Sequence, residues 1–180
     1  MGVFHKLCFF CQLKRGLLVT RLPIEDSKKE LTIVNLHLEA YDSGEGKRQQ
    51  TEILINFLLE EYSKGNYCVA GGDFNQTFPT IDNSRYPILD DSHFSPGSLD
   101  ADLLPEGWTF AADGDIPTSR LNNQPYNPAS PNTQHYVLDG FILSPNVELL
   151  SVQTLDGGFR YSDHNPVRLE IRLLAEEPSL

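Results

Sequence analysis

Polar side chains able to do chemistry interrupt apolar, strand-like segments at four places in this 180-residue sequence. They are His37 after VNL, Asp73 and Asn75 after CVAGG, Asp139 within YVLDGFIL, and Asp163 with His164 just before PVRLEI. A carboxylate in an apolar strand is costly unless it is paired or binds a metal. Histidine is its natural partner, because a carboxylate fixes the tautomer and orientation of an imidazole. Together with a divalent cation and a base that activates water, these groups suit hydrolysis of a phosphoester.

The stretch GGDFNQT, residues 71–77, predicts how one polar pair is presented. Two glycines after an apolar run let backbone or ligand approach closely. Because successive side chains of an extended chain alternate, Asp73 and Asn75 are expected on one side and Phe74 on the other, toward the core.

The first half of the sequence predicts a βαβ-like unit. Residues 17–22 and 31–38 are strand-like and separated by a polar turn, which predicts a hairpin. Residues 47–62 predict a helix, followed by a strand at 67–70. The helix places apolar residues at the spacing of a buried stripe, namely Leu54, Phe57, Leu58 and Tyr62. The order predicts a mixed α/β fold.

The second half is less regular. Residues 78–134 hold most of the prolines and many Asp, Asn and Ser residues, which predicts a long functional or disordered loop, although Trp108 and Phe110 indicate that it packs on something. Strands are expected again at 136–143, 147–155 and 166–174.

Composition favours one globular domain, with 39% hydrophobic and 22% charged residues. We expect that domain at residues 14–174, with an atypical segment 1–13 before it and a tail at 175–180. The net charge of −11 speaks against a large nonspecific phosphate-binding surface, which needs clustered Lys and Arg.

The three cysteines argue against a disulfide framework because their number is odd. Cys8 and Cys11 form a CFFC pair, which alone is weak evidence for a zinc or redox site. The segment before Leu17 does not resemble a signal peptide or a myristoylation site, and no apolar run is long enough for a transmembrane helix. The compartment is therefore unknown, and cytoplasmic by default.

Three motifs in order, N-x-H-L at 35–38, G-G-D-F-N at 71–75 and S-D-H-N-P-V at 162–167, resemble the endonuclease/exonuclease/phosphatase superfamily, which includes deoxyribonuclease I. L-D-G-F at 138–141 lies between the last two. The resemblance implies a two-sheet β-sandwich flanked by helices, that is, a four-layer α/β sandwich. It also implies a Mg²⁺ cofactor, with Mn²⁺ often tolerated, and a Mg²⁺-dependent hydrolase of phosphodiester or phosphomonoester bonds.

Carried over to this sequence, the resemblance implies a role for each polar residue. Asp73 resembles the carboxylate that orients or activates the attacking water, and Asn75 the amide that holds a phosphate oxygen. Asp163 resembles a metal-side carboxylate. His164, held by Asp139, resembles the histidine that contacts the scissile phosphate as acid or base. His37 resembles a second histidine on the other side of the phosphate.

The sequence departs from the family pattern near its start. The family places an Asn and a metal-binding Glu before the strand that corresponds to residues 17–22, and residues 1–13 contain neither. We therefore expect a domain lacking its N-terminal strands, completed by a missing segment or a partner. The alternative function is a catalytically silent truncated remnant or a binding module of the same fold.

Two further expectations concern the substrate. Arg120, in PTSR, is a candidate phosphate contact, although an exposed loop arginine is the plainer interpretation. The acidic net charge favours a small phosphoester, a phospholipid or a nucleotide over long duplex DNA, without excluding nucleic acid.

Overall fold

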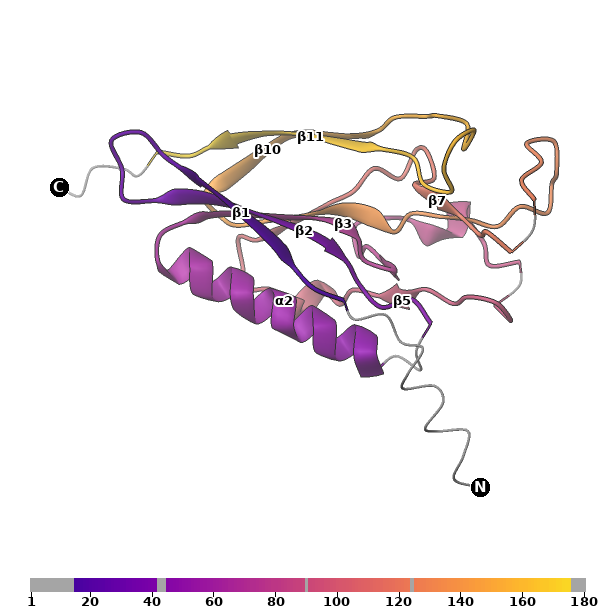
Figure 1. The fold of residues 1–180 in the computed structure, drawn as a ribbon, viewed down its shortest axis with the longest axis horizontal. Helices are drawn as coiled ribbons and strands as arrows, with labels where there is room; N and C mark the ends of the chain where they lie inside the picture. Colours follow the sequence, from indigo (N-terminus) through magenta and orange to yellow (C-terminus); the bar gives the residue numbers. More distant parts are fainter. Residues whose placement is uncertain (1–14, 42–44, 90, 124, 176–180) are drawn as a thin grey trace, which may run out of the picture.

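The computed structural model describes residues 15–41, 45–89, 91–123 and 125–175, which form a mixed α/β structure (Figure 1). The predicted CFFC pair and the terminal segments 1–13 and 176–180 lie outside the described residues. The long elements are β1 (Leu18–Pro23), β2 (Glu30–His37), α2 (Glu45–Ser63), β3 (Tyr67–Asp73), β9 (Asp139–Leu143), β10 (Val147–Thr154) and β11 (Val167–Leu173). The short ones are β4 (Gln76–Thr77), η1 (Asn83–Arg85), β5 (Gly97–Ser98), η2 (Ala101–Leu103), β6 (Thr109–Ala111), β7 (Ser119–Arg120) and β8 (His135–Tyr136).

A five-stranded sheet in the order β1-β2-β3-β9-β6 is the centre of the fold. The predicted hairpin is confirmed, because β1 pairs with β2 in antiparallel register. The predicted βαβ unit is confirmed as well, since β2 and β3 are parallel and α2 connects them. The expected strand 136–143 is instead divided into β8 and β9, and only β9 belongs to the central sheet.

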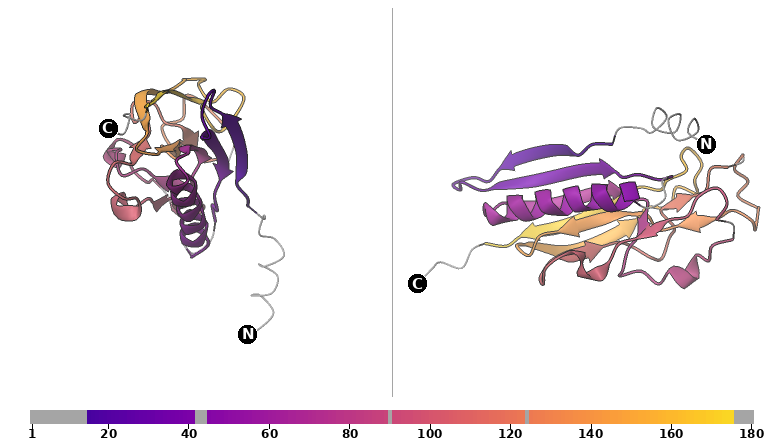
Figure 2. Two further views of the ribbon diagram at one scale, coloured as in Figure 1. Left: turned by 90° about the vertical axis from the view of Figure 1, so that its left-hand side faces the viewer. Right: turned by 90° about the horizontal axis from the view of Figure 1, so that it is seen from below.

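The two faces of this sheet are covered by different elements. In Figure 1, α2 lies on one side and the β10–β11 pair on the other, and the left view of Figure 2 shows β1 and β2 along one flank. Leu54 and Leu58 of α2 pack on Val34 and Leu36 of β2 in one buried cluster. Leu169, Ile171 and Leu173 of β11 are half-buried in a second cluster and alternate with exposed residues, as in a strand with one face turned inward.

These layers confirm a mixed α/β fold with more than one sheet. Among the described residues we find three layers, a helix, a five-stranded sheet and a two-stranded sheet, so the expected four-layer sandwich is not established. Within those same residues, no helix is both long and apolar enough to cross a bilayer.

The proline-rich segment is less disordered than its composition predicts. Its strand β6 pairs with β9 and forms the far edge of the central sheet. Trp108 meets Tyr62 of α2 edge-to-face at a centroid distance of 5.5 Å, and Phe110 meets Phe78 at 6.5 Å. The expectation that these two aromatic residues pack on the body of the domain is therefore confirmed.

A buried carboxylate anchors the end of α2 to the sheet. Glu61 is 1% exposed and accepts hydrogen bonds from Arg21 of β1, from Lys64 at 2.8 Å and from Asn66 at 3.1 Å. The hydrogen bond from Arg21, followed by those from Lys64 and Asn66, outweighs burial and lowers the pKa of Glu61 to about 2. Glu61 is therefore charged at neutral pH.

The double glycine at the end of β3 has a steric cause. Gly72 has φ of +143°, and a Cβ there would lie 2.0 Å from the carbonyl oxygen of Leu36 on the neighbouring strand. A Cβ on Gly71 would lie 2.4 Å from the ring of Phe141 on β9. Only glycine therefore allows β2, β3 and β9 to approach in this register.

We expect Gly72→Ala to destabilise the protein by about 3 kcal/mol or more, because it adds a backbone clash to a backbone conformation that alanine avoids. The measurement is the free energy of unfolding from urea denaturation. Gly16→Ala is the matched control, since a Cβ at Gly16 meets nothing within 4 Å. Equal stabilities of the two variants would contradict this explanation of the double glycine.

Candidate active site

Sheet register places three of the predicted residues in one row. His37 of β2 is the register partner of Asp73 of β3, and Asp73 is the register partner of Asp139 of β9. Register partners in adjacent strands point to the same face. That face is opposite to α2, because Leu36, next to His37, is buried against the helix side. His37 Nε2 lies 3.4 Å from Asp73 Oδ2.

The fourth residue, His164, reaches this row from the loop before β11. Its Nδ1 lies 2.9 Å from Asp139 Oδ2, and its Nε2 lies 3.8 Å from Asp73 Oδ2. A carboxylate only accepts, so the pairing with Asp139 assigns the proton of the neutral ring to Nδ1 and leaves Nε2 as the acceptor, next to Asp73 and Ser119. The structure thus brings together the carboxylate–histidine pair that the sequence predicts.

Asn75 completes the cluster, but not through an extended chain as expected. β3 ends at Asp73, and Asn75 has a left-handed φ of +51°. Its backbone N–H donates to Asp73 Oδ1 at 2.8 Å, and its Nδ2 donates to Asp73 Oδ2 at 3.2 Å and to the Leu38 carbonyl at 2.9 Å. A tight turn therefore sets the side-chain amide beside the carboxylate. Phe74 is fully buried, as predicted.

Burial and neighbouring charges shift the pKa values of two central groups. Burial raises the pKa of Asp73, and the charge of Asp139 raises it further, against the hydrogen bond from Asn75. Burial alone would lower the pKa of His164, but the hydrogen bond to Asp139 and the charges of Asp139, Asp73 and Asp163 outweigh it. The pKa of His164 is therefore raised. Both the Asp73 carboxylate and the His164 imidazole therefore keep a proton to higher pH than the free side chains do.

Two predicted residues lie at the edge of this cluster or outside it. Asp163 is half-buried, its charge helps to raise the pKa of His164, and its carboxylate makes no hydrogen bond with any residue that the structure describes. Arg120 Nη1 contacts the Leu121 carbonyl and Asn122 Oδ1, both at 3.4 Å, and contacts none of the clustered side chains. The structure therefore separates Arg120 from the other candidates.

Three residues that hold the cluster in place were not singled out from the sequence. Ser119 Oγ lies 3.3 Å from His164 Nε2, and the two residues form an isolated antiparallel bridge. Thr118 Oγ1 accepts from the backbone N–H of Leu138 at 2.9 Å and of Asp139 at 3.0 Å. Asn165 Nδ2 donates to the Pro117 carbonyl at 2.9 Å. The stretch PTSR at 117–120 and Asn165 of the S-D-H-N-P-V motif were the available signals.

The described residues do not complete the Mg²⁺ site that the resemblance implies. Both Asp73 oxygens already accept hydrogen bonds from Asn75, and Asp139 is engaged with His164. Across the part of the chain that the structure describes, no three His, Cys, Asp or Glu side chains group in a way that could hold a metal ion. Of the three clustered carboxylates Asp73, Asp139 and Asp163, only that of Asp163 has no hydrogen-bond partner among the described residues.

Comparison with solved structures agrees with this architecture. TDP2 of D. rerio, in complex with a single-strand DNA product, superposes with a TM-score of 0.58 at 17% identity. An endonuclease/exonuclease/phosphatase from Beutenbergia cavernae gives 0.57 at 18%, and the human Nocturnin catalytic domain with bound sulfate gives 0.55 at 16%. A scan against family models and a search of curated proteins gave no match.

These matches cover most of this chain but a smaller share of each solved chain. The matches cover 89%, 91% and 90% of this chain, in the same order, but only 63%, 40% and 54% of the other chains. At such identities the likeness concerns the fold. The fold agrees with the one that the order of the sequence motifs predicts. This chain has the fold of the endonuclease/exonuclease/phosphatase proteins, which is also called deoxyribonuclease-I-like.

Proposed function

We propose that this chain is a hydrolase of phosphodiester or phosphomonoester bonds, with His37, Asp73, Asn75, Asp139 and His164 as its reacting and binding groups. The observation that carries the proposal is the position of Asp73 Oδ2, which faces His37 Nε2 at 3.4 Å and His164 Nε2 at 3.8 Å. A carboxylate between two imidazoles can position a water molecule for attack, while N–H groups on both sides hold phosphate oxygens.

Each side chain has a defined task in this proposal. Asp73, whose pKa is raised by burial and by Asp139, orients the attacking water and takes its proton. His164, protonated more readily because of Asp139, donates Nε2–H to the phosphoryl group or to the leaving oxygen. His37 donates to a remaining phosphate oxygen, and Asn75 Nδ2 does so by exchanging its hydrogen bond to Asp73 Oδ2 for one to the phosphate, while it keeps its bond to the Leu38 carbonyl. Ser119 fixes the ring of His164 at 3.3 Å.

The cation requirement is a separate matter from these roles. The resemblance implies Mg²⁺, or Mn²⁺, with Asp163 as a ligand, but among the described residues no three His, Cys, Asp or Glu side chains group in a way that could hold a metal ion. We therefore assign no step to a cation and propose that Asp163 would be one ligand among others that come from outside the described residues. The metal arms of the assay below test this directly.

We propose a small phosphoester or a nucleotide as the substrate class rather than long duplex DNA. The chain carries 25 acidic and 14 basic residues, so it lacks the surplus of cations that neutralises a phosphate backbone. The D. rerio TDP2 structure holds a single-strand DNA product, which keeps nucleic acid among the candidate substrates.

A second candidate function is a binding module of the same fold without catalysis. One observation favours it, namely that no group of three metal-binding side chains occurs among the described residues. Such a module would bind phosphoesters through His37, Asn75 and His164 and leave them intact.

The first prediction separates these two functions. We expect the purified chain to hydrolyse bis-p-nitrophenyl phosphate, and we expect Asp73→Asn to lower kcat by at least about 100-fold, because it removes the group that accepts the proton of water. Turnover is followed with Mg²⁺, with Mn²⁺ and with EDTA.

The control for that variant is Asp102→Asn, which removes the same charge at an exposed position on η2. Asp102→Asn should keep wild-type turnover. A folded wild-type chain that hydrolyses nothing under any metal condition would overturn the hydrolase proposal in favour of the binding module.

The second prediction concerns pH. The raised pKa of His164 means that protonated imidazole, and the folding stability linked to it, persists to higher pH and is lost as the pH rises through the folded-state pKa. We expect Asp139→Asn to lower this pKa and so to move the alkaline limb of the kcat profile to lower pH. The His164 ring titration, followed by NMR, should shift in the same direction. An unchanged titration would contradict the assigned role of Asp139.

A further inference from the structure

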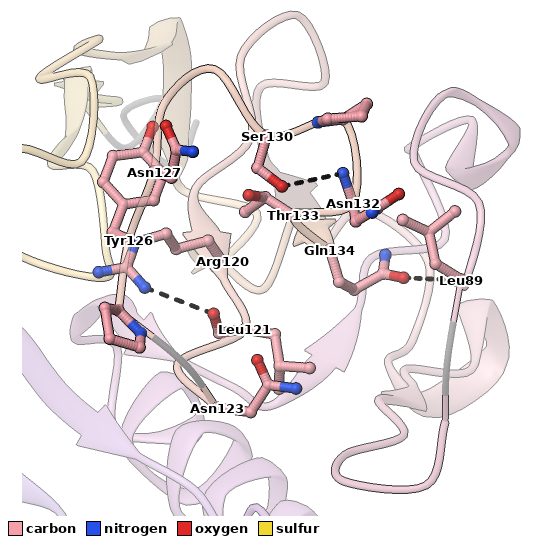
Figure 3. Close-up of a pocket in the computed structure, with 12 residues that line it drawn as sticks. Leu89, Arg120, Leu121, Asn123, Tyr126, Asn127, Ser130, Asn132, Thr133 and Gln134 are labelled. Atoms are coloured by element: carbon pink, nitrogen blue, oxygen red, sulfur yellow. Dashed lines mark hydrogen bonds between the residues drawn. The ribbon is translucent and has the colours of Figure 1, made fainter.

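A cavity that the proposed reaction does not use is lined by Arg120, the neighbour of Ser119 on β7. Described residues of the segments 120–123 and 125–134, together with Leu89, line this cavity of about 500 Å³ (Figure 3). We call it the loop pocket, and its polar lining consists chiefly of Arg120, Asn123, Tyr126, Asn127, Asn132 and Thr133. Its volume falls within the roughly 300–1,000 Å³ that is usual for small-molecule sites.

Arg120 enters this pocket with unused hydrogen-bonding capacity. Its guanidinium carbon lies 4.5 Å from the centre of the Tyr126 ring, so one face of the cation rests on the aromatic side chain. Arg120 Nε is buried and has no hydrogen-bond partner among the described residues. The only hydrogen bonds of its guanidinium within those residues are the two long ones to the Leu121 carbonyl and Asn122 Oδ1. Nη2 of the same guanidinium also has no hydrogen-bond partner among those residues and, unlike Nε, is not buried, so an acceptor on a ligand can pair with it.

The rest of the lining is neutral, aromatic and rich in amides. The side-chain amides of Asn123 and Asn132 make no hydrogen bond with any residue that the structure describes, and Figure 3 shows both at the pocket. An amide offers a donor and an acceptor together, which matches the edge of a nucleobase. Tyr126 and the plane of Arg120 are surfaces on which a base can stack.

The charge of the lining limits the ligand further. No Asp or Glu is among the described residues that line the pocket, although the chain carries 25 of them, and Arg120 is the one cation. A single arginine suits one phosphate group and is too little for a polyphosphate or a long strand.

The pocket shares strand β7 with the catalytic cluster. Side chains of successive strand residues alternate, so Ser119 meets His164 while Arg120 enters the pocket. The backbone N–H of Arg120 also donates to the Asp163 carbonyl at 3.0 Å. Arg120 of the pocket is thus the chain neighbour of Ser119, which contacts His164, and its backbone is bonded to the residue that precedes His164.

We propose that the loop pocket binds a nucleotide unit, that is, a planar base with its phosphate, as the part of the substrate beyond the bond that is cleaved. This inference rests on the proposed phosphoesterase function, but binding can be measured without turnover. The base stacks on a face of the Tyr126–Arg120 pair that the two side chains do not share with each other, its edge meets Asn123 and Asn132, and its phosphate accepts from the guanidinium of Arg120.

Isothermal titration calorimetry with AMP, adenosine and inorganic phosphate tests the proposal. The wild type should bind AMP more tightly than either fragment. Arg120→Gln and Tyr126→Ala should each weaken AMP binding by about tenfold or more, because they remove a charged donor and a stacking surface. Arg168→Gln is the control, since Arg168 lies on β11 and pairs with Glu170 away from the pocket.

Two results would overturn the proposal. One is a wild-type chain that does not bind AMP, and the other is AMP binding that neither Arg120→Gln nor Tyr126→Ala weakens while thermal unfolding shows both variants folded. A chain that turns over bis-p-nitrophenyl phosphate but fails to bind AMP would overturn the pocket alone. A chain that binds AMP through Arg120 without turnover would support the pocket and count against the hydrolase.

A single-stranded hexanucleotide, titrated in parallel, distinguishes the end of a nucleic-acid strand from a free nucleotide as the ligand of the pocket. Tighter binding than AMP, lost in Arg120→Gln, would support the end of a strand as the source. Equal or weaker binding would support a free nucleotide.

Discussion

The register between β2, β3 and β9 is the constraint on which the proposed active site depends. It sets His37, Asp73 and Asp139 side by side on one face of the sheet. A shift of one residue would turn every side chain of the shifted strand to the opposite face. Gly71 and Gly72 permit this register, because a Cβ on Gly71 would collide with Phe141 and one on Gly72 with the Leu36 carbonyl.

The loops add to this row what the strands cannot supply. His164 arrives from the turn before β11 and is fixed by Asp139 on one ring nitrogen and Ser119 on the other. Thr118 ties the strand end at Asp139 to the same segment, so one stretch of four residues, Pro117–Arg120, supports the proposed catalytic row and, through Arg120, also borders the loop pocket. A substrate that occupied both the row and the loop pocket would therefore lie along this one short segment.

Much of this arrangement could be predicted from the sequence, for physical reasons. Apolar runs with polar ends identified β2, β3 and β11, and the 3.6-residue period identified α2. Asp139 was singled out because a lone carboxylate in an apolar strand requires a partner. Ser119 and Thr118 escaped notice because hydroxyl groups in a proline-rich segment resemble ordinary turn residues. The left-handed turn at Asn75 escaped as well, since side-chain alternation assumes an extended chain.

The central claim is that water attacks phosphorus at this cluster, and the most direct measurement of it is turnover in ¹⁸O-labelled water. The account predicts that bis-p-nitrophenyl phosphate yields mono-p-nitrophenyl phosphate that carries the label, with unlabelled p-nitrophenol, and that Asp73→Asn slows the formation of this labelled product by at least about 100-fold. Label in the p-nitrophenol would place the attack at carbon and contradict the account. Labelled phosphate product that forms equally well in Asp73→Asn would contradict the role of the cluster.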